Sequence, residues 1–352
     1  MKEIILKTET VSAKIYIGDD VIQSRLPALT AGQKNFVVTD SNVFALYEDF
    51  FKTYFKDTEI FVLPAGEEYK TFSSLGKILE KMSIAGLHRT SRLFAVGGGV
   101  VGDIGGLSAS LYMRGISYVQ IPTTLLAQID SSVGGKTAVD VNGVKNIVGA
   151  FYQPMEVLVA PAFLKTLPKR ELKCGLGEMI KYCALDTTIF DKVNGACAWD
   201  DVQFLQSLIE DCIAYKAGVV SRDEKETGER RCLNVGHTTG HAIELATGLS
   251  HGESVLYGTW IETKLAIEHG VCEREYGENL LNILKKALQI QPIQNPDFNG
   301  IERYLQKAKS DKKNVGDGKI QMAVAQSRGQ WTMLALSYPD YESGVIKAVK
   351  AL

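Results

Sequence analysis

The sequence predicts an α/β protein of two domains, a parallel-sheet domain over residues 1–160 and an all-α domain over residues 161–352. In the first part, short β-branched and aromatic runs alternate with amphipathic stretches, which is typical of parallel strands joined by helices. After Pro161, apolar residues recur mainly at the helical period and few strand signals remain. At 352 residues the chain is also long for a single core, which favours two domains.

The expected strands are five apolar runs, at residues 36–40, 59–63, 93–96, 118–121 and 157–160. A helical pattern at 73–82 separates the second run from the third. A later helix, near 202–220, carries an apolar stripe that Lys216 continues. A lysine on a buried face is costly unless an anion meets it, so Lys216 predicts a nearby negative charge. The alternative is a lysine stem that reaches solvent at the helix end.

Composition excludes several classes of protein. Hydrophobic residues make up 45% and charged residues 23%, as in ordinary globular proteins. The net charge of −2 produces no overall field that would attract nucleic acid or an acidic membrane. The beginning of the chain lacks a signal-peptide core, and no later run approaches a membrane span. The six cysteines show no metal or disulfide spacing. We therefore expect a cytoplasmic protein that binds neither nucleic acid nor membrane.

A glycine motif follows the expected strand at 93–96. The run Gly-Gly-Gly-Val-Val-Gly-Asp at 97–103 satisfies G-x-G-x-x-G, in which glycines let backbone amides approach a pyrophosphate. The motif does not follow the first strand, and no acidic residue lies about 20 positions further on, as a Rossmann dinucleotide site would have. Asp40, after an earlier strand, is the better candidate for a ribose. A tight glycine turn is the alternative.

A second glycine loop runs from Asp130 to Lys136. It lacks the first glycine of a P-loop, which argues against ATP hydrolysis. A lysine beside paired glycines remains a reasonable ligand for a different phosphate group. Lys145, shortly downstream, supplies another cation.

Three of the five histidines lie within fifteen residues. His237 and His241 are four apart and share one face of a helix, and His251 follows a turn. Such a cluster suits zinc, which binds neutral imidazoles together with a carboxylate or thiolate. Glu178 is a candidate carboxylate. The alternatives are surface histidines, and a surface ion pair between Glu178 and Lys181 three residues on.

Taken in order, these motifs resemble the 3-dehydroquinate synthase family of sugar-phosphate cyclases. The resemblance is carried by GGGVVGD at 97–103, MRG at 113–115, a run at 121–154, GLGEMIKY at 175–182, a run at 223–244, HGESVLYG at 251–258 and DKKN at 311–314. It implies a dehydroquinate synthase-like fold, a Rossmann-like domain followed by a metal-binding domain. It also implies the conversion of 3-deoxy-D-arabino-heptulosonate 7-phosphate to 3-dehydroquinate and phosphate, with a transiently reduced NAD and a divalent metal, zinc or cobalt.

The resemblance also assigns residues. Glu178, His237 and His251 look like the metal ligands, and His241 would face the substrate phosphate. Asp130, Lys136, Lys181, Lys216 and His241 look like the catalytic residues. The substrate, a sugar-phosphate acid, would be held by Arg114, Lys136, Asn146, Arg230, Asn234 and Lys312, with Lys313 as the alternative to Lys312. The NAD site would comprise Asp40, Asn42, Glu67, Lys70, Gly99, Val100, Val101, Gly102, Asp103, Thr123, Thr124, Lys136, Lys145, Phe163, Leu164, Lys165 and Thr166.

Arg114 would reach the neighbouring subunit, which implies a homodimer. The nearest alternative functions are a metal-dependent polyol or glycerol-type dehydrogenase and a sister sugar-phosphate cyclase. A non-catalytic NAD or metal sensor on the same fold is a third alternative, disfavoured because no expected metal, phosphate or carboxylate position is missing.

Overall fold

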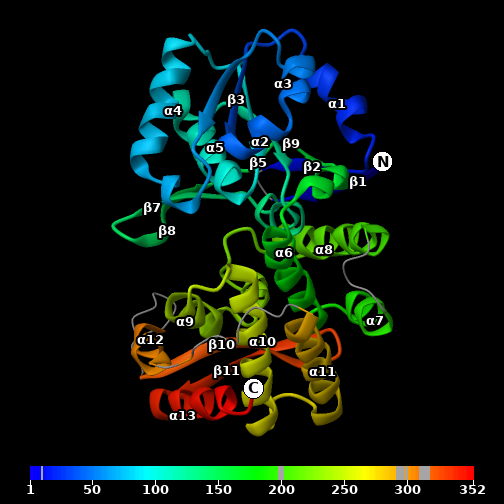
Figure 1. The fold of residues 1–352 in the computed structure, drawn as a ribbon, viewed down its shortest axis with the longest axis vertical. Helices are drawn as coiled ribbons and strands as arrows, with labels where there is room; N and C mark the ends of the chain where they lie inside the picture. The colour runs from blue at the N-terminus through cyan, green and yellow to red at the C-terminus, as the bar shows by residue number, and fades with distance from the viewer. Residues whose placement is uncertain (9–10, 197–201, 291–297, 299, 309–317) are drawn as a thin grey trace. The chain divides into compact units, whose positions relative to one another are not determined.

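The structure is a computed structural model that describes residues 1–352 except 9–10, 197–201, 291–297, 299 and 309–317 (Figure 1). The chain divides into two compact units. The first unit comprises Met1–Leu172 and Lys216–Lys225, and the second comprises Lys173–Tyr215 and Glu226–Leu352. The sequence predicted a domain boundary after residue 160, whereas the first unit continues to Leu172. The sequence analysis also did not predict that residues 216–225 belong to the first unit.

The first unit is built on a seven-stranded sheet with the strand order β1-β2-β9-β6-β5-β3-β4. The five expected strands correspond to β3, β4, β5, β6 and β9, which pair in parallel. Two further strands, β1 and β2, were not predicted, and β1 runs antiparallel at the edge. The strands are β1 (Lys2–Lys7), β2 (Ser12–Ile17), β3 (Asn35–Asp40), β4 (Glu59–Leu63), β5 (Arg92–Gly97), β6 (Ser117–Pro122) and β9 (Glu156–Val159).

Helices cover both faces of this sheet, as Figure 1 shows. On β3, Val37 packs into one core cluster with residues of α1 and α3, while Phe36 and Val38 pack into another with residues of α4 and α5. Successive strand side chains point to opposite faces, so a strand buried on both sides is apolar throughout. The helices are α1 (Val21–Thr30), α2 (Ser41–Leu46), α3 (Glu48–Tyr54), α4 (Phe72–Ile84) and α5 (Gly99–Leu111).

An antiparallel ribbon follows the second glycine loop. Strands β7 (Lys136–Val141) and β8 (Val144–Phe151) pair with each other and are joined by Asn142 and Gly143. Both turn residues have positive φ, 53° and 74°, as a type I′ hairpin turn requires. The Asn-Gly pair is a strong hairpin signal, and the sequence prediction missed it.

The strand order changes direction between β3 and β5. Strands β3 and β5 are neighbours, yet the chain leaves β3 toward β4 on one side and leaves β5 toward β6 on the other. Connections that diverge from adjacent parallel strands open a ligand-binding crevice at their carboxyl ends. Asp40 ends β3 and Gly97 ends β5, so the first acidic candidate and the glycine motif meet there.

The second unit is largely helical and is organised around α10. This helix is buried on nearly all sides and packs against α9, α11, α13 and β10. The helices are α6 (Lys169–Lys181, which begins in the first unit), α7 (Thr187–Gly195), α8 (Val202–Arg222, which ends in the first unit), α9 (His237–Thr247), α10 (His251–Glu268), α11 (Arg274–Ile290), α12 (Ile301–Ala308) and α13 (Tyr338–Val349).

The expectation of an all-α second domain is corrected by one hairpin. Strands β10 (Lys319–Ser327) and β11 (Gln330–Ser337) pair antiparallel. The buried residues of β10 include a continuous run, 322–325, which lacks the alternation that marks a half-exposed strand. A short apolar run of this kind does not distinguish a strand from a buried helix, because tertiary packing decides between them.

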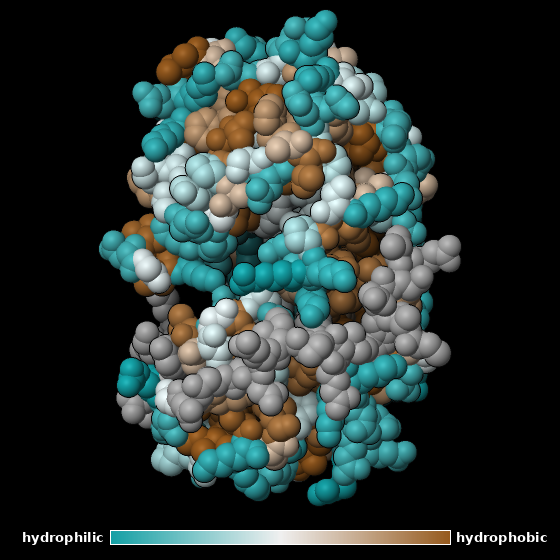
Figure 2. Space-filling view, in the orientation of Figure 1, coloured by the Kyte–Doolittle hydropathy of each residue, from teal (hydrophilic) through white to brown (hydrophobic). Residues whose placement is uncertain are grey.

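The visible surface is mixed in character. On the face drawn in Figure 2, hydrophobic residues lie in small groups among hydrophilic ones. Within the described residues, no helix is long and apolar enough to cross a bilayer.

Candidate metal and dinucleotide sites

Three helices of the second unit bring the candidate metal ligands together. Glu178 lies on α6, His237 is the first residue of α9, and His251 is the first residue of α10. Each ligand is next to a glycine at a helix crossing. A Cβ at Gly177 would lie 2.1 Å from the carbonyl oxygen of Gly252, so no larger residue fits there. The close backbone approach brings the ligand side chains within reach of one another.

The Glu178 carboxylate meets both imidazoles. Its Oε1 lies 3.4 Å from Nε2 of His237 and 3.2 Å from Nε2 of His251. Ligand atoms about 2.0–2.1 Å from a tetrahedral zinc ion are separated by about 3.3 Å, so these spacings suit zinc. Glu178 is 1% exposed, and its Oε1 has no well-aligned hydrogen-bond donor among the described residues.

Partners on the far side of each ring set the tautomers. Nδ1 of His237 lies 3.1 Å from the carbonyl oxygen of Val235, which only accepts, so this nitrogen carries the hydrogen. Nδ1 of His251 lies 3.1 Å from Oε2 of Glu244 and likewise donates. Both Nε2 atoms therefore face Glu178 as potential lone-pair donors. Electron-rich atoms that converge in a buried place need a positive charge among them, a proton or a metal ion.

The electrostatics fit that requirement. Burial lowers the pKa of His237 well below its ordinary value, so this ring is neutral. Burial alone would raise the pKa of Glu178, but Lys181 and the two histidines hold it well below its ordinary value. Burial also lowers the pKa of His251, but its contacts with the carboxylates of Glu178 and Glu244 more than offset this and raise the pKa to about 10. In the chain without metal, His251 thus carries the positive charge.

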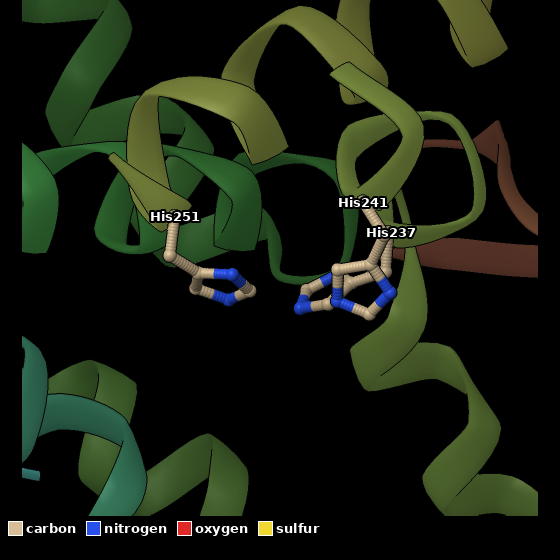
Figure 3. A group of neighbouring side chains, drawn as sticks. All are labelled: His237, His241 and His251. Carbon is tan, nitrogen blue, oxygen red and sulfur yellow. The ribbon is translucent and has the colours of Figure 1, made fainter. Parts of the chain in front are cut away.

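His241 completes a cluster of three histidines (Figure 3). One ring nitrogen of each of His237, His241 and His251 lies within 4.8 Å of the others. Two candidate ligand sets therefore lie together. One is the set implied by the family resemblance, Glu178, His237 and His251, and the other includes the i,i+4 pair His237 and His241. Contact with the buried carboxylate distinguishes His237 and His251, because Glu178 contacts their Nε2 atoms. These two histidines and Glu178 match the His₂Glu donor set of catalytic zinc sites.

Further candidates lie in the same unit. Lys181 is buried, and its Nζ lies 2.6 Å from Oε2 of Glu178 and 3.0 Å from the carbonyl oxygen of Leu233. The expected alternative of a surface ion pair is wrong, since both side chains are 1% exposed. Arg230 is also buried, and Nδ2 of Asn234 donates to Glu226 at 2.5 Å. Lys312 and Lys313 lie outside the described residues.

In the first unit, most NAD candidates share one edge of the sheet. They lie at or just after the carboxyl ends of five parallel strands, the edge at which open parallel sheets bind ligands. Asp40 and Asn42 follow β3, Glu67 and Lys70 follow β4, Gly99, Val100, Val101, Gly102 and Asp103 follow β5, Thr123 and Thr124 follow β6, and Phe163, Leu164, Lys165 and Thr166 follow β9. Lys136 and Lys145 lie on the β7–β8 ribbon, and both are exposed.

Two acidic residues at this edge have defined partners. One oxygen of Asp40 accepts hydrogen bonds from the backbone amides of Asn42 and Val43 and caps α2. Nζ of Lys70 lies 2.5 Å from Asp103 and 2.6 Å from Oδ1 of Asn146. Burial raises the pKa of Asp103 to about 6, although Lys70 opposes the shift.

The anion predicted for Lys216 is Asp130. Nζ of Lys216 lies 2.8 Å from the Asp130 carboxylate and 2.7 Å from its carbonyl oxygen, and the lysine side chain is 7% exposed. The alternative of a lysine that reaches solvent is therefore wrong. Arg114 is exposed and has a φ of +67°, an uncommon conformation for a residue with a side chain.

Sequence comparison decides the family. Two family models match consecutive parts of the chain, 3-dehydroquinate synthase N-terminal over residues 60–174 and 3-dehydroquinate synthase C-terminal over residues 175–314. The chain belongs to the 3-dehydroquinate synthase family. A family member from Caldanaerobacter subterraneus subsp. tengcongensis, named 3-dehydroquinate synthase, is 41% identical over 99% of this chain and 100% of its own length.

Solved structures of related cyclases share the fold. A 2-deoxy-scyllo-inosose synthase complexed with carbaglucose-6-phosphate, NAD⁺ and Co²⁺ is 26% identical, with a TM-score of 0.87 over 98% of this chain and 100% of that one. A 2-epi-5-epi-valiolone synthase from Streptomyces hygroscopicus subsp. jinggangensis 5008, with NAD⁺ and Zn²⁺ bound, is 25% identical, with a TM-score of 0.84 over 98% of each chain. The predicted order, a Rossmann-like parallel-sheet domain followed by a helical one, is thereby confirmed, except that the second domain is largely helical and not all-α.

The sequence analysis missed one residue of this chain that lies against the candidate metal ligands. Glu244 was not a candidate, yet its carboxylate contacts Nδ1 of His251. A signal was present, because Glu244 follows His237 by seven residues and so lies on the same face of α9. The sequence indicated that this face of α9 carries candidate metal ligands, but it did not show that the face contacts α10.

Proposed function

We propose that this enzyme converts 3-deoxy-D-arabino-heptulosonate 7-phosphate to 3-dehydroquinate and phosphate, and is therefore a lyase. The overall reaction oxidises a substrate hydroxyl to a ketone, eliminates phosphate, reduces that ketone again, opens the sugar ring and closes a carbocycle by an internal aldol step. The observation that carries the proposal is the 41% identity over 99% of the chain to a 3-dehydroquinate synthase. The geometry of the candidate sites supports it.

The metal proposal rests on the donor set of the second unit. Glu178, His237 and His251 would hold a divalent ion, zinc or cobalt, as the buried Oε1 and the two Nε2 atoms suggest. A bound ion of this kind supplies Lewis-acid polarisation of a substrate hydroxyl. Lys181 keeps the Glu178 carboxylate ionised, and Glu244 holds the proton of His251 at Nδ1.

The NAD proposal rests on the residues gathered at the carboxyl ends of the parallel strands of the first unit. The residues at the carboxyl ends of the five parallel strands would hold the dinucleotide, with the pyrophosphate at the amino end of α5. A bound NAD supplies a hydride acceptor that later returns the hydride. Lys70 and Asp103 form a buried ion pair at this edge, which would orient the side chains there.

The substrate carries a carboxylate and a phosphate, so its binding needs cations in a protein of near-zero net charge. In the second unit, we propose that Lys181, Arg230 and Asn234 bind it, and that His241 contacts the phosphate. In the first unit, we propose Asp130, Lys136, Asn146 and Lys216. The pairing of Lys216 with Asp130 places and orients the lysine side chain, which is 7% exposed. We also propose Lys312 as a ligand, a homodimer in which Arg114 reaches its partner, and a cytoplasmic location.

The test follows phosphate and NADH together. Purified enzyme is incubated with the heptulosonate phosphate, sub-stoichiometric NAD and zinc. Many phosphates released per NAD, without net NADH, is the expected result. NADH that accumulates without phosphate would instead show a polyol-type dehydrogenase. If neither phosphate nor NADH appears, sedoheptulose 7-phosphate and glucose 6-phosphate are tested as substrates of a sister cyclase. If none of the three sugar phosphates reacts, the result favours the non-catalytic sensor.

A further inference from the structure

Glu262, on α10, is a buried carboxylate outside every candidate site described above. It is 0% exposed. Its Oε2 accepts a hydrogen bond from the backbone amide of Gly236 at 2.8 Å, and its Oε1 accepts one from the backbone amide of Thr239 at 2.7 Å. Burying a carboxylate costs several kcal/mol unless strong donors compensate, so these bonds have a specific role.

These two amides belong to the amino end of α9, which has no side-chain cap of its own. The residue before the helix is Gly236, with a φ of +77°. No residue with a side chain fits at Gly236, because a Cβ there would lie 2.1 Å from Oγ1 of Thr259. The first amides of a helix have no partner within the helix. Glu262 therefore caps α9 from a different helix, whereas α10 is capped locally by Ser250 and Glu253.

The capped end carries a metal ligand. His237 lies between Gly236 and Thr239, and His251 starts the helix that contains Glu262. The two hydrogen bonds therefore tie the first turn of α9 to α10. Any sliding of one helix along the other would change the separation of the two Nε2 atoms from Oε1 of Glu178.

A second contact supports the same end of α9. Oγ1 of Thr239 lies 3.1 Å from the hydroxyl of Tyr341, which is 1% exposed and lies on α13. The α13 helix packs against α10 as well. Thr239 is therefore held through both its backbone and its side chain, and α9 has little freedom to rotate at this turn.

We propose that Glu262 is a positioning residue for the metal site, which acts by fixing His237 relative to His251. The inference rests on the proposed function only in that His237 and His251 hold the metal. The carboxylate of Glu262 binds the backbone amides of Gly236 and Thr239, so its effect on His237 is transmitted by the backbone of α9.

The test compares metal affinity in Glu262→Gln with that in Glu268→Gln, a matched change on the same helix at an exposed residue paired with Lys347. An amide offers one acceptor oxygen where the carboxylate offers two. We expect Glu262→Gln to weaken Co²⁺ and Zn²⁺ binding by about 10–100-fold, the range for residues that orient metal ligands. The Co²⁺ absorption spectrum should also change, and the control should remain within twofold of the original chain.

A merely structural role would have a different outcome. It would lower the melting temperature of Glu262→Gln but leave the metal affinity and Co²⁺ spectrum of the folded protein unchanged, which would overturn the proposal. Glu262→Asp keeps the charge and should show an intermediate affinity. If the original chain binds no metal, the metal site of the proposed function fails. If the original chain and Glu262→Gln bind equally, only the role of Glu262 fails.

Hydrogen exchange in the unsubstituted chain tests the contact without any variant. The amides of Gly236 and Thr239 should exchange as slowly as those inside α10, although first-turn amides are ordinarily exposed. Exchange at the rate of loop residues would contradict the proposed cap, even if a Glu262 variant failed to fold.

Discussion

Oε1 of Glu178 and Nε2 of His251 meet at 3.2 Å, and each side chain is held from its far side. Lys181 pairs with the other oxygen of the carboxylate, and Glu244 contacts the other nitrogen of the ring. Neither side chain can turn away without losing its charged partner. The site is therefore preorganised for a cation, and its outer contacts should matter for both affinity and stability.

Glu178→Gln should separate metal binding from stability. The change removes a proposed ligand and leaves the ammonium of Lys181 buried beside a neutral group. We expect metal affinity to fall by more than about 100-fold, and the metal-free chain to lose about 3 kcal/mol of unfolding free energy, as when a buried pair is broken. Isothermal titration and urea unfolding measure the two quantities.

The control for this change is Glu171→Gln, an exposed residue on the same helix. The double variant Glu178→Gln/Lys181→Met should regain stability without regaining metal affinity. Recovery of both would show that Glu178 acts only through the ion pair.

Glu244→Ala should weaken metal binding although Glu244 is not a proposed ligand. It contacts Nδ1 of His251 at 3.1 Å and so fixes the tautomer that presents Nε2. We expect about a 10–100-fold loss in zinc affinity, measured by competition with a chelator. Glu275→Ala, at an exposed position of α11, is the matched control. Equal affinities in the two variants would exclude an orienting role for Glu244.

Metal binding should release a proton at neutral pH. The pKa of His251 in the metal-free chain is about 10, because Glu178 and Glu244 outweigh the effect of burial. A metal ion at Nε2 must displace this proton, so affinity should rise about tenfold per pH unit below that pKa. Calorimetry in buffers of different ionisation enthalpy counts the protons. Release of none between pH 6 and 8 would contradict the assignment.

Asp103 should give a pH-dependent contribution to stability. Its folded pKa, about 6, lies above the ordinary value of 3.8 because of burial. The folded state therefore binds the proton more tightly, so this contribution is present below pH 3.8 and is lost as pH rises through 6. The shift of about two units corresponds to about 3 kcal/mol.

Comparison with Asp103→Asn isolates this titration, since other carboxylates titrate in both chains. The difference in unfolding free energy, unsubstituted minus variant, should fall as pH rises from 4 to 7. A difference that rises with pH would show that Lys70 governs the pKa of Asp103 instead.

The sheet was largely predictable because its central strands are buried on both faces. Phe36, Val37 and Val38 form an unbroken apolar run, since the run must fill a core on either side. Strands β1 and β7 were missed for the opposite reason. Their burial is partial, and their side chains include lysines that face water. Partial burial leaves only a weak pattern in a short segment.

The sequence predicted which residues could form the candidate metal site, but not which of their side chains contact one another. The spacing of His237 and His241 indicates a helix face with metal-binding capacity, and motif order supplied Glu178 through a family resemblance. Glu244 and Glu262 resemble ordinary helical glutamates in the sequence. Their partners lie on other elements or across turns, and helical periodicity carries no information about such pairs.

By itself, the sequence determined the buried strands, the glycine motif and the supply of nitrogen and oxygen donors, because these follow from local composition and spacing. Only the tertiary structure decided which donors meet. Glu178, His237 and His251 converge because the backbones of α6, α9 and α10 approach closely at Gly177, Gly236 and Gly252, where any Cβ would collide with a neighbouring element. Packing between helices that are distant in the chain is a property of the whole core, and no single segment contains it.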